Sequence, residues 1–174
     1  KFPILLLSAL IPAFILSFAS IVFNFIPFYF VAVLLGSIFI FTVINSINYQ
    51  DGMDGLAGGE VLISLLGFVI MSLITGNSLA LTLAIVAAGA VSAFLFFNLP
   101  PAKIFMGDSG AYSLGFVLTV IAILFSKTYN VYSVLGPVFI IGLPIFDGIF
   151  TNIRRIVAGK SIFLGDRSHF YDRL

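Results

Sequence analysis

The sequence predicts an all-α fold, a polytopic bundle of transmembrane helices. Of the 174 residues, 61% are hydrophobic and 9% are charged, and the mean hydropathy is +1.23. Soluble domains carry about 25% charged residues. No Lys, Arg, Asp or Glu occurs within residues 2–50, 61–102, 109–126 or 128–146. Because about 20 such residues cross a bilayer as one helix, we expect an integral membrane protein rather than a soluble helical domain.

Turn residues divide this apolar sequence into about six expected spanning helices. Gly76-Asn77-Ser78 is a turn signal, and Pro100-Pro101 opens a polar loop. The chain has no cysteine, which excludes disulfides and thiolate metal sites. We treat residues 1–174 as one integral membrane domain. The expected helices cover residues 2–19, 28–44, 60–75, 79–97, 111–126 and 131–153.

The distribution of charge predicts which side of the membrane each loop faces. With six spans, the polar segments 45–59 and 98–110 lie on the same side as both chain ends. That side carries every basic residue except Lys127, so the positive-inside rule assigns it to the cytoplasm. All seven acidic residues also lie on or near this face, and no basic run favours nucleic acid. We therefore expect a multi-pass plasma-membrane protein with its polar groups on the cytoplasmic face.

The first polar segment combines amides, carboxylates and glycines. Asn45, Asn48 and Asp51 recur every three residues, a spacing that puts them on one flank of a helix as it ends. Glycines follow Asp51 and Asp54 and let the backbone turn tightly. Carboxylates with flanking amides suit a hard cation such as Mg²⁺, or a polar nucleotide. The alternative is a polar loop that only caps helix ends.

The second polar segment places Asp108 after a glycine, just before the expected fifth helix. Asp108 could be an ordinary N-cap, but a helix N-terminus also favours phosphate. With Lys103 nearby, the segment could hold both a metal and an anion.

Further polar groups lie near the carboxy-terminal end of the chain. Asp147, close to an arginine pair, fits a structural hydrogen bond at least as well as catalysis. Arg167 and His169 in the tail could form a phosphate clamp.

Together these segments resemble the polyprenyl-phosphate N-acetylhexosamine-1-phosphate transferase family. This family includes the phospho-N-acetylmuramoyl-pentapeptide transferase and N-acetylglucosamine-1-phosphate transferases. The match is carried by Asn-x-x-Asn-x-x-Asp-Gly-x-Asp-Gly-Leu-Ala at 45–57 and Asn-x-x-Pro-Ala-Lys-x-Phe-Met-Gly-Asp-x-Gly at 98–110. Pro144-x-x-Asp147, Arg154-Arg155 and Asp166-Arg167-x-His169 add to it, in the family's order.

The resemblance implies transfer of a sugar 1-phosphate from a UDP-N-acetylhexosamine to a polyprenyl phosphate, with release of UMP. It implies Mg²⁺, with Mn²⁺ as a possible substitute, and catalysis at the cytoplasmic face for cell-envelope or surface glycan synthesis. The expected partners are the two substrates, the membrane and, as an option, a second copy of the chain. The implied roles are catalysis for Asp51, Asp54, Asp108 and His169, magnesium binding for Asp108, and substrate binding for Asn45, Asn48, Asn98, Lys103, Phe105 and Arg167. Phe105 would stack on the uridine, and Arg167 and His169 would bind phosphate or sugar groups.

The chain also departs from the family pattern. The family has about ten spans and an aspartate pair in an earlier cytoplasmic loop, whereas this chain has no Asp before Asp51. We therefore expect the carboxy-terminal part of a larger transferase. The tail reads His169-Phe170-Tyr171-Asp172 where many relatives have further histidines, which leaves the sugar open. Arg154-Arg155 and the tail favour the N-acetylglucosamine branch over the peptidoglycan branch.

Two other classes of function remain as alternatives. A cation-coupled transporter would coordinate ions with acids and amides at broken helices, and its carboxylates should lie near the middle of the membrane. A non-catalytic scaffold gives no reason for glycine-flanked aspartates in two separate loops.

Overall fold

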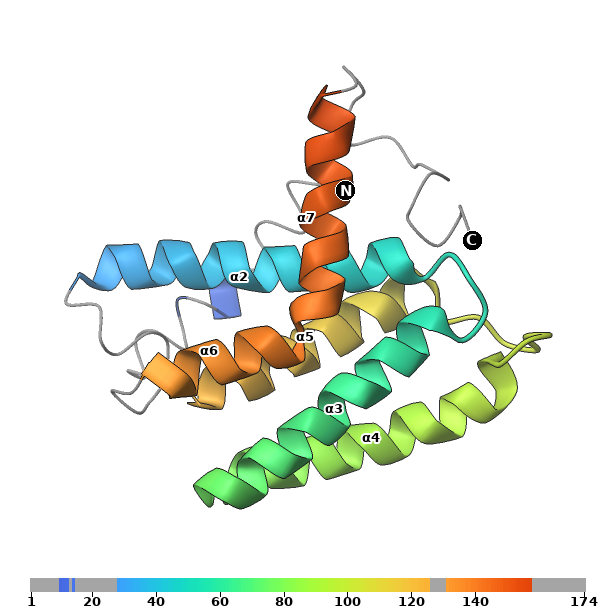
Figure 1. The fold of residues 1–174 in the computed structure, drawn as a ribbon, viewed down its shortest axis with the longest axis horizontal. Coiled ribbons are helices and arrows are strands. Elements are labelled where there is room, and N and C mark those ends of the chain that lie inside the picture. Colours follow the sequence, from blue (N-terminus) through green and yellow to red (C-terminus); the bar gives the residue numbers. More distant parts are fainter. Residues whose placement is uncertain (1–9, 13, 15–27, 126–130, 158–174) are drawn as a thin grey trace.

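The computed structural model describes residues 10–12, 14, 28–125 and 131–157, and its regular structure in these ranges is α-helical. This confirms the predicted all-α class. Figure 1 shows α2, α3, α4, α5 and α6 as a bundle, while α7 runs away from it at a large angle. The helices are α2 (Tyr29–Gln50), α3 (Leu56–Thr75), α4 (Ser78–Asn98), α5 (Gly107–Phe125), α6 (Val131–Ile140) and α7 (Gly142–Val157).

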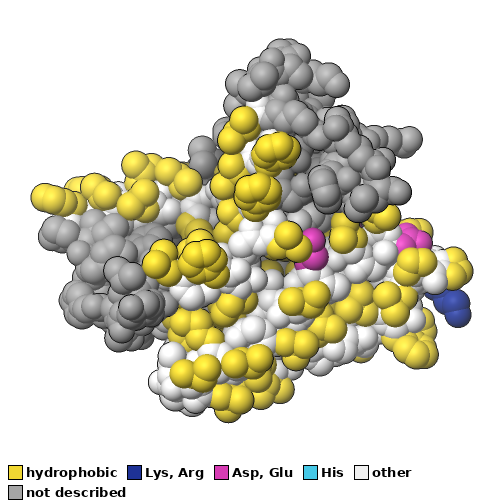
Figure 2. Space-filling model, in the orientation of Figure 1, with side chains coloured by type: hydrophobic (Ala, Val, Ile, Leu, Met, Phe, Trp, Pro, Cys, Tyr) yellow, Lys and Arg dark blue, Asp and Glu magenta, His cyan; other side chains and the backbone are white. Residues whose placement is uncertain are grey.

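Four helices, α2 to α5, are long and apolar enough to cross a membrane, with 19 to 22 residues each. They correspond to four of the expected spans and confirm a polytopic bundle. The first expected helix, residues 2–19, lies almost entirely outside the described residues. Figure 2 shows hydrophobic side chains across the visible face, and the visible Lys or Arg side chain lies at the end of the bundle that carries the polar loops.

The helices approach one another closely where side chains are small. A Cβ on Gly115 of α5 would lie 2.8 Å from the Cα of Ile44 in α2, so only glycine fits this contact. A Cβ on Gly58 of α3 would likewise lie 2.8 Å from the side chain of Leu95 in α4. Small residues at such contacts are how membrane helices pack tightly. The close α2–α5 contact places the ends of these helices side by side.

The segment 45–59, predicted as a loop, is mostly helical. Helix α2 continues to Gln50 and α3 already begins at Leu56, so the connection shrinks to residues 51–55. Polar side chains do not end α2 because they find partners or burial within the bundle: the Asn45 amide donates to the Phe41 carbonyl at 2.8 Å. Gly55 is the N-cap of α3, and its φ of 77° lies in the left-handed region that glycine adopts freely.

The expected sixth helix, residues 131–153, is interrupted. Helices α6 and α7 meet at Ile141, because Pro144 has no N–H for the carbonyl of Ile140 and its ring crowds that carbonyl. The hydroxyl of Ser64 in α3 donates to the Ile140 carbonyl at 3.2 Å and satisfies it. Ten residues of α6 extend about 15 Å, half of a bilayer core of about 30 Å. This segment is therefore not one continuous spanning helix.

Candidate active site

The two polar segments meet at one end of the bundle and enclose a cleft. The turn 51–55 and the loop 99–106 both lie at the right-hand end of the bundle in Figure 1. The cleft has a volume of about 360 Å³. Its lining residues are Asn48, Asp51, Gly52, Met53, Asp54, Asn98, Phe105, Gly107 and Asp108. Six of the residues predicted for the site therefore gather in one place.

Asp108 is held over the end of α2. The amide of Asn48, near the end of α2, donates to Oδ1 of Asp108 at 3.1 Å. Helix α5 begins at Gly107, so Asp108 lies in its first turn rather than ahead of the helix as an N-cap. The dipole of α5 favours a negative charge at this position. The hydrogen bond orients the Asp108 carboxyl group, which lines the cleft.

Asp51 ends α2 and lies half-buried beside Asp108. Burial raises the pKa of the Asp51 carboxyl above its ordinary value, and the negative charge of Asp108 raises it further. A hydrogen bond from the backbone N–H of Gly107 opposes this rise but does not cancel it. Two carboxylates thus share one region of the cleft at an electrostatic cost that a bound cation would remove.

Asp54 and Asn98 join the two loops. Oδ2 of the exposed Asp54 accepts a hydrogen bond from the backbone N–H of Ala102 at 3.0 Å. Asn98, only 4% exposed, accepts from the N–H of Gly55 at 3.0 Å and donates to the carbonyl of Ile104 at 2.8 Å. The bonds from Gly55 to Asn98 and from Ala102 to Asp54 cross-link segments more than 40 residues apart, and the bond from Asn98 to Ile104 holds the loop 99–106 against the end of α4.

Phe105 and Lys103 differ in their relation to the cleft. Phe105 lines it and is 76% exposed, so its ring is available for stacking. Lys103 is exposed on the same loop but is not among the lining residues. Asn45 lies one turn before Asn48 and is also outside the lining, with its amide bonded within α2.

The remaining predicted groups belong to the carboxy-terminal region. Asp147 is on α7, as is the pair Arg154-Arg155. Arg167 and His169 lie outside the described residues, so their roles stay predictions.

Gly107 is a site residue that the sequence interpretation did not single out. Its N–H bonds Asp51, and its φ of 67° is in the left-handed region. A side chain here would strain the backbone that links Asp51 to Asp108. The available signal was the glycine directly before Asp108 at the start of a helix.

The donor groups of the cleft fit a Mg²⁺ ion that also binds water and substrate better than they fit a metal whose ligands all come from the protein. In the described ranges, no group of three or more His, Cys, Asp or Glu side chains is placed to hold a metal. Asp51 and Asp108 supply two carboxylates with amide neighbours. Mg²⁺ is commonly bound by one or two carboxylates, with water and substrate phosphates completing its shell.

Comparison with known proteins identifies the relatives of the chain. The model of glycosyl transferase family 4 matches residues 1–126. A probable undecaprenyl-phosphate N-acetylglucosaminyl 1-phosphate transferase of Bacillus subtilis (strain 168) is 41% identical over 133 residues, which cover 76% of this chain and 37% of that protein. The decaprenyl-phosphate N-acetylglucosaminephosphotransferase of Mycobacterium leprae is 35% identical over 153 residues, covering 76% and 38%.

A third relative represents another branch. The phospho-N-acetylmuramoyl-pentapeptide-transferase of Dictyoglomus turgidum is 40% identical over 119 residues, covering 68% of this chain and 38% of that protein. The chain thus spans little more than a third of the length of these relatives. Because the family model covers well over half of the chain and both loop motifs line one cleft, the chain belongs to glycosyl transferase family 4.

Proposed function

We propose that the chain is the carboxy-terminal part of a transferase that moves an N-acetylhexosamine 1-phosphate from a UDP-sugar to a polyprenyl phosphate. UMP is the second product, and the lipid-linked sugar enters cell-envelope or surface glycan synthesis. The observation that supports this most directly is the convergence of Asp51, Asp54 and Asp108 in one cleft at the end of the bundle. The names of the relatives from Bacillus and Mycobacterium support the lipid phosphate and the sugar phosphate.

The cleft offers what phosphoryl transfer requires. The reaction depends on neutralising charge on phosphate oxygens and on aligning the attacking and leaving groups. Asp108, oriented by Asn48, is the main expected Mg²⁺ ligand, and Asp51 lies beside it. Bound Mg²⁺, or Mn²⁺ in its place, would supply positive charge to the pyrophosphate of the donor. Asp54 and Asn98 keep the two walls of the cleft at a fixed separation.

The rim of the cleft suits the uridine. The exposed ring of Phe105 can stack on the base, and aromatic–base stacking contributes about 1–3 kcal/mol. Asn98 and Asn45 remain the other proposed substrate contacts. Asn98 already bonds Gly55 and Ile104, and Asn45 bonds Phe41, so such contacts would use the remaining hydrogen-bonding capacity of each amide. Lys103 stands on the loop above, where it can attract the phosphates. Arg167 and His169 are the proposed phosphate or sugar contacts from the tail.

The orientation in the membrane follows from charge. Lys103 in the loop 99–106 favours the cytoplasmic side for the cleft. A cleft at that boundary can bring a soluble nucleotide sugar to the phosphate of a lipid. The proposed location is the plasma membrane, with the active site on its cytoplasmic face.

The positions of the carboxylates argue against a cation-coupled transporter. The break between α6 and α7 is the kind of discontinuity that transporters use, but it is built from Pro144, Ser64 and apolar residues. The carboxylates of the cleft lie instead at helix ends and in turns. Ion-coupling carboxylates would be expected near the middle of the membrane.

The proposal is tested with the complete transferase in vesicles that contain polyprenyl phosphate. Radiolabelled UDP-N-acetylglucosamine, UDP-N-acetylgalactosamine and UDP-N-acetylmuramoyl-pentapeptide are offered in turn, with Mg²⁺ or with a chelator. We expect label to enter the lipid from one of these donors, UMP to appear in equal amount, and both to stop when Mg²⁺ is removed. Failure of all three donors would contradict the proposed reaction. Residues 1–174 alone should be inactive, and transfer by this chain would contradict its assignment as one part of the enzyme.

A further inference from the structure

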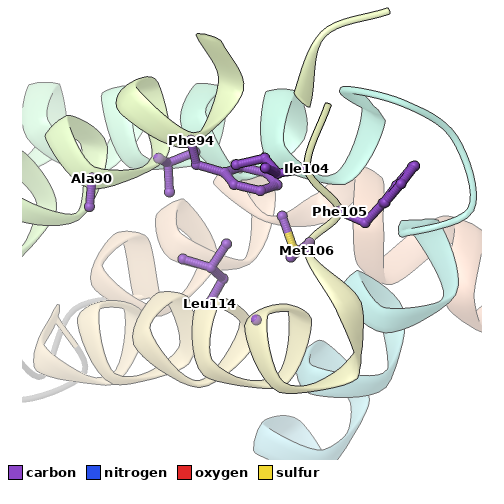
Figure 3. Close-up of a pocket in the computed structure, with 8 residues that line it drawn as sticks. Ala90, Phe94, Ile104, Phe105, Met106 and Leu114 are labelled. Carbon is purple, nitrogen blue, oxygen red and sulfur yellow. The ribbon is translucent and has the colours of Figure 1, made fainter. Parts of the chain in front are cut away.

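A second cavity lies between α4 and α5, directly beside the cleft. It has a volume of about 300 Å³ and is lined by apolar residues and a glycine. Figure 3 shows side chains from α4, from the loop 99–106 and from α5 pointing into it, among them Phe94, Met106 and Leu114. Phe105 belongs to the lining of both this cavity and the cleft. The cavity is therefore an apolar groove that adjoins the nucleotide end of the site.

The middle of the groove is flanked by small residues on both helices. Gly89, Ala90 and Ala93 are exposed on α4, and a Cβ on Gly89 would meet nothing within 4 Å. On α5, Ser109 and Ser113 are exposed, and the Ser113 hydroxyl donates to the Ser109 carbonyl of its own helix at 2.7 Å. On the same face of α4, Val86 and Phe97 are 66% and 47% exposed, so the room for another backbone to come close is confined to the stretch of small residues between them.

The exposed face of α3 has the opposite character. It presents Ile63, Leu66, Ile70, Leu73 and Ile74, which are 50% to 79% exposed. Large aliphatic side chains of this kind suit contact with lipid tails. Interfaces between membrane helices are instead enriched in Gly, Ala and Ser, which let backbones approach. The contrast indicates that α3 faces lipid and that the α4–α5 groove faces a helix.

Helix α4 also has the most surface left to cover. Only 28% of its spanning segment is buried, compared with 39% to 50% for α2, α3 and α5. The chain matches 37% to 38% of the length of its relatives, so a transferase of that length has further segments to place against this surface.

From these observations we infer that the α4–α5 groove is the docking site of a membrane-spanning helix from the upstream part of the same transferase. One end of this helix borders Phe105 and Met106, so it forms a wall at the rim of the cleft. The inference uses the proposed function only in assigning the chain to the carboxy-terminal part of a larger enzyme. It does not depend on the donor sugar, the metal or the reaction.

The test is site-specific photo-crosslinking in the complete transferase. A benzophenone amino acid replaces Ala90 in the groove, and a protease site placed just before Lys1 separates the upstream part from this chain after illumination. We expect light to keep the two parts together on a denaturing gel, with mass spectrometry locating the bond in an upstream apolar helix. The matched control replaces Ile70, 60% exposed on α3, where the two parts should separate and only lipid adducts should form.

A second crosslinking position covers the case in which the variant at Ala90 does not fold. Placing the benzophenone amino acid at Phe94 replaces one aromatic side chain by another, so this variant should give a monodisperse protein in detergent. Adducts with lipid alone at positions 90 and 94 would overturn the inference, as would a bond between two copies of the enzyme. Crosslinking needs no turnover. An inactive enzyme with an upstream crosslink would therefore contradict only the proposed function, and an active enzyme without one would contradict only the docking site.

Discussion

Asn98 provides the most informative single substitution, because its side chain joins both walls of the cleft. It is 4% exposed, and its amide bonds the N–H of Gly55 and the carbonyl of Ile104. Asn98→Ala removes both bonds at once. The partly buried N–H of Gly55 is left without this acceptor, while the carbonyl of the more exposed Ile104 can turn to water.

The expected loss of stability follows from these two groups. A fully buried group without a partner costs about 1–3 kcal/mol, and an exchangeable hydrogen bond is worth about 1 kcal/mol. Because Gly55 is only partly buried, Asn98→Ala should lower the free energy of unfolding by about 1–3 kcal/mol. Asn98→Asp keeps the acceptor for Gly55 but puts a carboxylate at a buried position facing the Ile104 carbonyl, so it should cost at least as much as Asn98→Ala.

The matched control is Asn77, which caps α4 at the opposite end. Its Oδ1 accepts from Ala80 N–H at 3.1 Å, and its Nδ2 donates to Leu124 at 3.3 Å. Asn77→Ala should cost about 1 kcal/mol, the usual value for a lost N-cap, without affecting the cleft.

The measurement is an SDS titration in mixed micelles followed by far-UV circular dichroism, since the chain has neither Trp nor Cys for other probes. Binding of UMP with Mg²⁺ is measured in parallel. Asn98→Ala should weaken UMP binding and Asn77→Ala should not. If Asn98→Ala unfolds within about 0.5 kcal/mol of the wild type and binds UMP normally, the bridging role of Asn98 is refuted.

Three further predictions concern neighbouring features. Phe105→Ala should raise the KM for the UDP-sugar roughly tenfold and leave that for the lipid unchanged, and an unchanged KM for the nucleotide sugar would argue against stacking. Ser64→Ala should lower the free energy of unfolding by about 1 kcal/mol, because it frees the Ile140 carbonyl. Ser72→Ala on the same helix should be nearly neutral, because the buried Ser72 hydroxyl has no partner in the described structure. Equal losses of stability for the two variants in an SDS titration would contradict this. Because the folded state raises the pKa of Asp51, the ionised Asp51 carboxylate opposes folding at neutral pH. Without Mg²⁺, Asp51→Asn should therefore unfold at a higher temperature than the wild type. A lower unfolding temperature would show that the charge is stabilising.

The membrane helices could be predicted from the apolar runs, and the meeting of the two loops could be predicted from the topology. Two spanning helices separate the segments near Asp51 and Asp108, so both segments return to the same side of the membrane. The packing of the helices then brings the two segments together. The exact end of α2 could not be predicted in this way. Its polar residues read as a loop, but Asn45 bonds its own helix and Asn48 bonds Asp108, 60 residues away.

The role of Asn98 was only partly predictable for a similar reason. Its motif indicated a site residue, whereas its two bonds depend on how α3 and the loop 99–106 pack. The break at Ile141 had a visible cause in Pro144, but proline is tolerated in spanning helices when a neighbour satisfies the freed carbonyl. Here Ser64 satisfies the Ile140 carbonyl, and the chain nevertheless changes direction between α6 and α7. This change of direction depends on helix packing and could not be predicted from the sequence.

The central claim is that the cleft carries out metal-dependent phosphoryl transfer with Asp108 at its centre. It is tested most directly by Asp108→Asn in the complete transferase, with the exposed neighbour Ser109→Ala as control. Helical circular dichroism should be unchanged in both variants. Asp108→Asn should lower the Mg²⁺-dependent transfer of labelled sugar phosphate to the lipid by about a hundredfold or more, and Ser109→Ala should remain near the wild type. Near-normal transfer by Asp108→Asn would contradict the account.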